Sequence, residues 1–173
     1  MKEGLIHLYH GEGKGKTTAA IGIAVRAAGN GLKVLFVQFM KGNETGELNV
    51  LGRVSGVTVF RSNKNLGFVS KMSEEEKQQL TDIHNEILGK VILVAEEYDM
   101  IVLDEVTYPC SYELINGDLL RQFIEKKPPQ TELILTGRNP VQFMIDKADY
   151  ITNMTCEKHP YESGITARKG IEF

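Results

Sequence analysis

The feature that most constrains this chain is the glycine-rich segment 11–18, which reads Gly-Glu-Gly-Lys-Gly-Lys-Thr-Thr. An apolar run at 5–9 precedes it and has strand character, and an apolar run without proline at 19–28 follows it and has helix character. A strand, a glycine-rich loop and Gly-Lys-Thr at a helix start together form the context of a phosphate-binding loop. Backbone N–H groups of such a loop point at one anion, and the helix dipole adds to the attraction. The sequence therefore predicts a nucleotide site here.

Two side chains of this segment have predicted roles. Lys16 is expected to place its ammonium group on phosphates, and the Thr17 hydroxyl is expected to hold Mg²⁺. The segment departs from G-x-x-x-x-G-K-[ST] at its beginning, because the first glycine is expected at position 10, where the chain has His10. Gly11 comes one residue later, so the predicted loop is one residue short.

A second informative stretch is 100–105, where four apolar residues are followed by Asp104 and Glu105. A buried strand ending in acids is the Walker B pattern, which delivers carboxylate to Mg²⁺. The pattern alone is weak evidence, but it stands roughly 90 residues after a phosphate loop, as that motif requires. We therefore predict that Thr17, Asp104 and Glu105 bind the metal.

The rest of the chain alternates strand-like and helix-like segments. Predicted strands are 33–39, 57–61, 132–137 and 150–155, and the last of these is expected in the core. Predicted helices are 73 to about 97, 116–127 and 140–147. Loops are expected at 41–51 and 62–72, and a polar tail at 156–173. This order predicts an α/β fold with a mostly parallel sheet and helices on both faces. Right-handed crossovers would place the phosphate loop and the acidic pair side by side.

Three residues near the expected carboxyl edge, Gln38, Lys41 and Glu47, either line the site or belong to a solvated loop. The residues 73–76 look like a capping box at a helix start. His84 falls between the apolar positions of that helix and is expected at its surface or boundary.

Length and composition limit the classes of protein. A chain of 173 residues is expected to form one domain, 1–173, and 42% hydrophobic with 25% charged residues is ordinary for a soluble protein. A net charge of −3 disfavours nucleic acid as the main partner, and no apolar stretch approaches the roughly 20 residues of a membrane span. The first residues lead straight into a strand, which leaves no room for a signal peptide. Cys110 and Cys156 are far apart and are expected to be reduced structural thiols of a cytoplasmic protein.

A phosphate loop does not say what is done with the nucleotide. The segment 146–149, Asp-Lys-Ala-Asp, is near the guanine-reading Asn-Lys-x-Asp but precedes a strand and lacks the Asn, so we interpret it as a chance match. A small-molecule kinase would need an acid for the hydroxyl proton and an arginine-rich lid, and the arginines are not clustered. A P-loop ATPase, a small-molecule kinase and a nucleotide-binding module without chemistry remain alternatives.

Several segments in order resemble the BtuR/CobA type of ATP:corrinoid adenosyltransferase. They are 11–18, 37–42 (Val-Gln-Phe-Met-Lys-Gly), 102–108 (Val-Leu-Asp-Glu-Val-Thr-Tyr), 135–138 (Leu-Thr-Gly-Arg) and the ending 158–171. The resemblance covers nearly the whole chain. It implies a RecA-like P-loop fold, usually as a homodimer. The implied reaction transfers the 5′-deoxyadenosyl group of ATP to the cobalt of a reduced corrinoid and releases triphosphate.

The resemblance also implies residue roles. The residues expected to bind ATP are Gly11, Glu12, Gly13, Lys14, Gly15, Lys16, Thr17, Thr18, Arg26 and Arg138. Lys16 and Glu105 are expected to be catalytic, with Mg²⁺ as cofactor and a flavoprotein as candidate reductant. Co(I) is already a strong nucleophile, so no general base is needed, whereas the polyanionic leaving group must be stabilised. In the family, ATP lies reversed along the loop, and the shortened cradle is consistent with that.

Two departures from the family pattern matter. The family commonly has Gly-Phe-x-Trp where this chain has Gly-Phe-Val-Ser at 67–70, and the chain contains no tryptophan. Phe68 is the residue expected to contact the corrinoid and to keep part of the role of displacing its lower axial base, which Ser70 cannot share. The alternative is that Phe68 is a loop aromatic packed on the core. Many family members also have an N-terminal extension over the nucleotide, so a more open site is expected here.

Overall fold

The computed structural model describes residues 3–40, 45–62 and 69–172. Its described part contains a six-stranded sheet in which all neighbouring strands are parallel, in the order β3-β2-β4-β5-β1-β6. The strands are β1 (Ile6–His10), β2 (Val34–Gln38), β3 (Val57–Arg61), β4 (Met100–Asp104), β5 (Glu132–Gly137) and β6 (Tyr150–Asn153). The α-helices are α1 (Lys16–Gly29), α2 (Gly46–Leu51), α3 (Glu74–Val94), α4 (Thr107–Ser111), α5 (Gly117–Lys126) and α6 (Gln142–Lys147). Short 3₁₀ turns lie at Val69–Lys71, Ala95–Glu97 and Pro160–Ser163.

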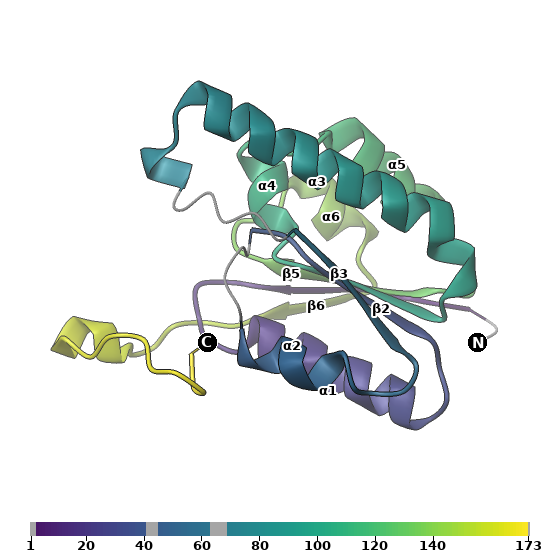
Figure 1. The fold of residues 1–173 in the computed structure, drawn as a ribbon, viewed down its shortest axis with the longest axis horizontal. Coiled ribbons are helices and arrows are strands. Elements are labelled where there is room, and N and C mark those ends of the chain that lie inside the picture. The colour runs from purple at the N-terminus through teal and green to yellow at the C-terminus, as the bar shows by residue number, and fades with distance from the viewer. Residues whose placement is uncertain (1–2, 41–44, 63–68, 173) are drawn as a thin grey trace.

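Helices cover both faces of the sheet. Figure 1 shows α1 and α2 below the sheet and α3, α5 and α6 above it. Strand side chains alternate between the faces: Phe36 packs in the core cluster with Ala20 of α1, whereas Leu35 packs in the cluster with Leu88 of α3. The central strands are therefore apolar at nearly every position, as buried parallel strands require. The predicted RecA-like α/β architecture is confirmed.

The strand order brings the two sequence motifs to one edge. β1 precedes the phosphate loop, β4 ends within the acidic pair, at Asp104, and β5 lies between these strands. Because all three strands are parallel, their carboxyl ends meet at the same edge, where ligands bind in open α/β sheets. The phosphate loop and the acidic pair are thus close, although β5 separates their strands.

The helix predicted from residue 73 begins as expected. The Ser73 hydroxyl accepts a hydrogen bond from the Glu76 backbone N–H (3.2 Å), and the Glu76 carboxylate accepts one from the Ser73 backbone N–H (2.8 Å). This is a complete capping box. With the 3₁₀ turn at Ala95–Glu97, the helical segment ends at the predicted residue.

The prediction for His84 was wrong. Its side chain is 1% exposed, and its Nδ1–H donates to the carbonyl oxygen of Leu114 at 2.7 Å. Its ring also packs edge-on against Phe39, at 5.5 Å between ring centroids. Burial lowers the pKa of His84, so the imidazole is held neutral. The side of α3 that faces the sheet is wider than the apolar stripe alone indicated, because a histidine with a backbone acceptor can be buried.

Two other predictions need correction. The predicted loop 41–51 contains α2, whose Leu51 is buried together with Leu48 on the α1 side of the sheet. Tertiary packing here outweighs the weak helix propensity of this glycine-containing segment. The strand predicted at 150–155 is not a core strand: among the described strands β6 pairs with β1 alone, and its four residues are exposed. It is the edge of the sheet.

Remaining expectations have plain outcomes in the described part. Asp149, in the near-match to a guanine-reading motif, accepts a hydrogen bond from the Ile6 backbone N–H at 2.8 Å and so anchors β1, which supports the interpretation as a chance match. Cys110 and Cys156 are both free thiols, but Cys156 is exposed and has no place in the core. Among the helices of residues 3–40, 45–62 and 69–172, none has the length and apolar character to span a bilayer.

Candidate active site

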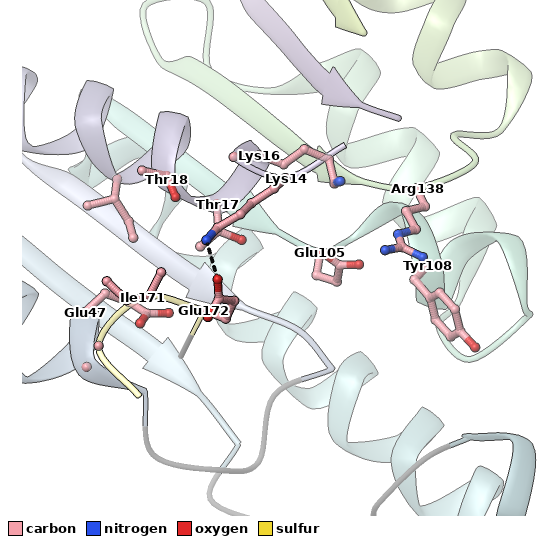
Figure 2. Close-up of a pocket in the computed structure, with 14 residues that line it drawn as sticks. Lys14, Lys16, Thr17, Thr18, Glu47, Glu105, Tyr108, Arg138, Ile171 and Glu172 are labelled. Carbon is pink, nitrogen blue, oxygen red and sulfur yellow. Dashed lines mark hydrogen bonds and ion pairs between the residues drawn. The ribbon is translucent and has the colours of Figure 1, made fainter. Parts of the chain in front are cut away.

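A pocket of about 700 Å³ opens at the carboxyl edge of the sheet (Figure 2). Its walls come from the phosphate loop and the first turns of α1, the start of α2, the turn after β4, Arg138 after β5, and the chain segment 170–172. Of the residues predicted to bind ATP, those that line this pocket are Lys14, Gly15, Lys16, Thr17, Thr18 and Arg138. Both sequence motifs thus contribute to one cavity.

The start of α1 is suited to an anion. Gly15 is its N-cap, with φ +114°, and no side chain caps the first-turn N–H groups. Such uncapped N–H groups attract anions at a helix N-terminus. A left-handed backbone at this position favours glycine, so Gly15 allows the loop to enter the helix with its N–H groups directed outward.

Lys16 is folded over the loop. Its side chain is 8% exposed, and its Nζ donates to the carbonyl oxygens of Gly11 at 2.7 Å and Gly13 at 2.8 Å. Burial lowers the pKa of Lys16, and Glu105 is the largest influence that opposes this effect. Because the hydrogen-bond acceptors of this buried cation are neutral carbonyls, a polyanion in the pocket would favour its charged form.

The first two glycines of the loop have a structural reason to be glycine. A Cβ atom on Gly11 or Gly13 would collide with backbone atoms of the segment that follows β6. The Gly13 N–H donates to the carbonyl oxygen of Met154 at 2.6 Å. The shortened loop is therefore packed against the chain leaving β6, and it presents the N–H groups from Gly15 onward to the pocket.

The two acids at the end of β4, Asp104 within the strand and Glu105 directly after it, have different surroundings. Asp104 is fully buried, and its carboxylate accepts hydrogen bonds from Thr136 Oγ1 (2.7 Å), Thr17 Oγ1 (3.3 Å) and Gln38 Nε2 (3.4 Å). Glu105 is half-buried and lines the pocket. Its backbone has φ +61°, and its N–H donates to Thr136 Oγ1 at 2.8 Å. Asp104 is fixed by neighbours, and the strained turn directs Glu105 into the cavity.

The donor set at this point suits a magnesium ion. The Thr17 hydroxyl lies beside the Asp104 carboxylate, and Glu105 lines the same cavity. Among the described residues, no group of three or more His, Cys, Asp or Glu is arranged for a metal. Mg²⁺ is usually held by one or two carboxylates together with waters and substrate phosphates. One hydroxyl and two carboxylates beside a phosphate loop fit that requirement.

Other residues predicted for the site have three different outcomes. Glu12 forms an ion pair with Arg138 at 3.1 Å, both being about half exposed, so Glu12 contacts the site through Arg138. Arg26 is exposed in the last turn of α1, about 15 Å of helical rise from Lys16, and the structure does not bring it to the loop. Phe68, the predicted corrinoid contact, and Lys41 lie outside the described residues.

Gln38 and Glu47, which were expected either to line the site or to lie in a solvated loop, have different outcomes. Gln38 is 1% exposed and donates to both Asp104 and Glu47, the latter at 3.3 Å. Glu47 lines the pocket at the start of α2. Glu47 therefore lines the site as one alternative predicted. Gln38 is not among the lining residues and lies buried beside Asp104, its partner in the register of β2 and β4.

Sequence reasoning missed the contribution of the chain end. Gly170, Ile171 and Glu172 line the pocket, and the Glu172 carboxylate accepts from Lys14 Nζ at 3.0 Å (Figure 2). Arg168 holds the same carboxylate through its backbone N–H (2.8 Å) and its guanidinium (3.0 Å). Arg168, followed by Lys14, lowers the pKa of Glu172 to about 2. Residue types alone predict only a polar tail here, and the family resemblance over 158–171 is the signal that the segment belongs to the site.

Comparisons with known proteins agree with this geometry. Residues 2–173 match the family model described as ATP:corrinoid adenosyltransferase BtuR/CobO/CobP. The chain belongs to this family. Relatives named corrinoid adenosyltransferase include those of Escherichia coli K12 (32% identity, 99% of this chain, 87% of the relative) and Sinorhizobium sp. (33%, 99% and 81%). Corrinoid adenosyltransferase CobA of Salmonella typhimurium LT2 is 34% identical over 99% of this chain and 87% of its own length.

A solved structure shares the fold alone. The flagellar accessory protein FlaH from Methanocaldococcus jannaschii superposes with a TM-score of 0.58 over 88% of this chain and 72% of its own, at 17% identity. The family membership identifies a transferase that moves the adenosyl group of ATP to a corrinoid. The ATPase, kinase and pure binding-module alternatives are therefore set aside.

Proposed function

We propose that the pocket transfers the 5′-deoxyadenosyl group of ATP to the cobalt of a reduced corrinoid, with Lys16 and Glu105 as the catalytic residues. The observation that carries this proposal is the family match over 2–173. The pocket supports it, because Lys16, Thr17 and Glu105 line one cavity large enough for a nucleotide. We treat residues 1–173 as one catalytic domain.

The chemistry requires charge stabilisation more than proton transfer. Co(I) supplies the electron pair of the new bond to C5′, the C5′–O bond breaks, and its electron pair leaves with triphosphate. No proton is removed from the nucleophile. The growing negative charge on the leaving oxygen must be met by fixed donors, and in many enzymes such electrostatic stabilisation accelerates the reaction more than any other effect.

Lys16 is the side chain best placed for that task. Its ammonium group exchanges the carbonyls of Gly11 and Gly13 for phosphate oxygens when ATP binds. The exchange replaces two neutral acceptors with a polyanion, so the pKa of Lys16 rises in the complex. Lys14 and Arg138 line the same pocket and add further positive charge.

We propose Mg²⁺ as the cofactor, held by Thr17, Asp104 and Glu105. When bound, it would neutralise part of the triphosphate charge. Asp104 is positioned by its hydrogen bonds to Thr136, Thr17 and Gln38. Glu105, aimed into the cavity by its left-handed backbone, is the carboxylate whose removal should affect the metal requirement more.

Four finer points extend the proposal. The edge strand β6 is exposed, with Tyr150 52% and Ile151 48% exposed. Proteins usually cover a sheet edge of this kind, and we propose that a second copy covers it in a homodimer.

We propose a reduced flavoprotein as the electron donor for Co(II), because flavins deliver single electrons. A cytoplasmic location fits such a donor. Phe68 is proposed to contact the corrin, on the family pattern at 67–70.

The test is incubation with MgATP and chemically reduced cob(I)alamin. The expected products are adenosylcobalamin, followed by its light-sensitive spectrum, and triphosphate, separated from ADP and phosphate by ion-exchange chromatography. ATP consumption should depend on the corrinoid. Steady ADP release without corrinoid would instead indicate an ATPase or kinase and would overturn the proposal.

A further inference from the structure

Two tyrosines of α4 lie at one end of the pocket. Tyr108 lines the cavity with Glu105 and Arg138, and Figure 2 shows it on the far side of Glu105 from the Lys14–Glu172 pair. The Tyr108 ring stacks on Tyr112, with centroids 4.3 Å apart and planes inclined by 24°. Among the described residues that line the pocket, Tyr108 is the only aromatic one. Within the described lining, the aromatic surface of the pocket therefore lies at one end.

The position of this surface is fixed by hydrogen bonds to the turn after β5. Thr107 Oγ1 donates to the carbonyl oxygen of Arg138 at 2.6 Å, and Ser111 Oγ donates to that of Asn139 at 2.5 Å. Thr107 is fully buried and packs closely on Gly137. A Cβ atom on residue 137 would collide with the Thr107 hydroxyl. Because α4 is held at both ends, the ring of Tyr108 stays close to Glu105. A preformed surface of this kind costs little entropy on binding.

We propose that Tyr108, backed by Tyr112, stacks on the adenine ring of ATP, an inference that rests on the function proposed above. Adenine is flat, with two open faces, and base–aromatic stacking is a general mode of base binding. The corrin is already assigned to Phe68 on the family pattern, which leaves adenine as the flat group for this surface. Of the two substrates, the nucleotide base fits the tyrosine surface.

The charges along the pocket agree with this placement. From Tyr108 the cavity passes Arg138 and Glu105, then Lys16, and reaches Lys14 (Figure 2). With adenine on Tyr108, the triphosphate would lie among the three cations of this pocket, Arg138, Lys16 and Lys14. At the other end of the pocket, around Glu47 and Glu172, the described lining residues offer no aromatic ring on which a base could stack.

The experiment measures binding of ATP and of inorganic tripolyphosphate to the same variants by calorimetry, with no corrinoid present. Tyr108→Ala should raise the Kd of ATP roughly 5- to 100-fold, the range for loss of one base–aromatic stack. Its Kd for tripolyphosphate should change by less than about two-fold, because the phosphate sites are untouched. Tyr108→Phe keeps the ring and should bind both ligands like the parent protein. Tyr112→Ala should produce a smaller loss, for ATP only.

Controls keep the test decisive. Tyr161→Ala removes a tyrosine that is 73% exposed and does not line the pocket, and it should change neither Kd. Equal losses for ATP and tripolyphosphate would overturn the proposal, because Tyr108 would then only support the loop. An unchanged Kd for ATP would also overturn it, because Tyr108 would then make no contact with the base. Since binding alone is measured, the result stands whether or not the transfer reaction is observed.

Discussion

The two sides of the pocket are built in different ways. The side formed by the strand ends is buried: Asp104 is 0% exposed, and Thr136, Thr17 and Gln38 surround its carboxylate. The side formed by the chain end is exposed and is held by ion pairs, in which the side chains of Lys14 and Arg168 are 52% and 59% exposed. Buried networks are rigid and costly to disrupt, whereas exposed ion pairs are weak. We therefore expect chemistry to depend on the first side and access on the second.

The largest effect should come from Lys16→Ala. We expect a loss of about 10²-fold or more in the rate of adenosyl transfer, because a charge aimed at the developing polyanion is removed. The melting temperature should change little, since Lys16 contacts loop carbonyls and not the core. Stopped assays of adenosylcobalamin formation, with thermal melts alongside, give both numbers. A folded, fully active variant would remove Lys16 from the mechanism.

The acidic pair tests the buried side directly. Glu105→Gln should raise the Mg²⁺ concentration needed for half-maximal rate by about 10-fold or more and leave the fold intact, since a metal-binding carboxylate in the cavity is lost. Asp104→Asn should raise this Mg²⁺ concentration by a smaller factor. It should also lower the melting temperature, because an amide cannot accept all three hydrogen bonds of the buried carboxylate. Metal titrations and melts of both variants separate the roles. An unaltered metal requirement in both would show the Walker B interpretation to be wrong.

The pH dependence of ATP binding should report Lys16. Its pKa in the protein without ATP lies below the ordinary 10.5 because of burial, and bound triphosphate favours the protonated form. Binding is therefore strongest below the pKa of Lys16 in the ATP-free protein. Affinity falls by up to about 10-fold per pH unit above that pKa, until the higher pKa of the complex is reached.

Calorimetry between about pH 7.5 and 10.5 tests this expectation against Lys16→Arg, whose guanidinium stays charged throughout. The variant should show a nearly flat profile. A wild-type affinity that is constant over this range would contradict the lowered pKa. Proton uptake on binding, measured in buffers of different ionisation enthalpy, is an independent check.

The smallest effect is expected on the exposed side. Glu172→Gln removes a carboxylate that competes with triphosphate for Lys14, so ATP should bind about two- to five-fold more tightly, and less so at high salt. Glu157→Gln, an exposed substitution in the same tail, is the matched control and should have no effect. Weaker ATP binding by Glu172→Gln would mean that the tail is part of the rigid site, and the contrast between the two sides would not hold.

Local patterns explain what the sequence could predict. The phosphate loop, the acidic strand and the capping box at Ser73 each lie within a few consecutive residues. Their residue types and spacing are therefore enough to predict them. The parallel α/β sheet follows from the alternation of apolar strands and helices. These parts of the fold and site are confirmed, or brought into one pocket, by the structure.

Long-range contacts explain what it could not predict. The pairing of Lys14 with Glu172 joins residues 158 positions apart, and no local pattern encodes it. The burial of His84 depends on a carbonyl oxygen at Leu114 in another segment. Arg26 is a candidate for ATP by residue type, and only the direction of α1 shows that it lies at the far end of the helix.

The attachment of the tail has a consequence for chain entropy. Gly13 binds Met154, and the next residue, Lys14, binds Glu172, so the segment 154–172 forms a ring closed on two adjacent residues of the phosphate loop. Closing such a ring costs configurational entropy that grows only slowly with its length. The first closure is a short backbone hydrogen bond, and the second is an ion pair in water, which dissolved salt screens. Ionic strength, acting on this second closure, therefore sets how often the tail lies across the pocket.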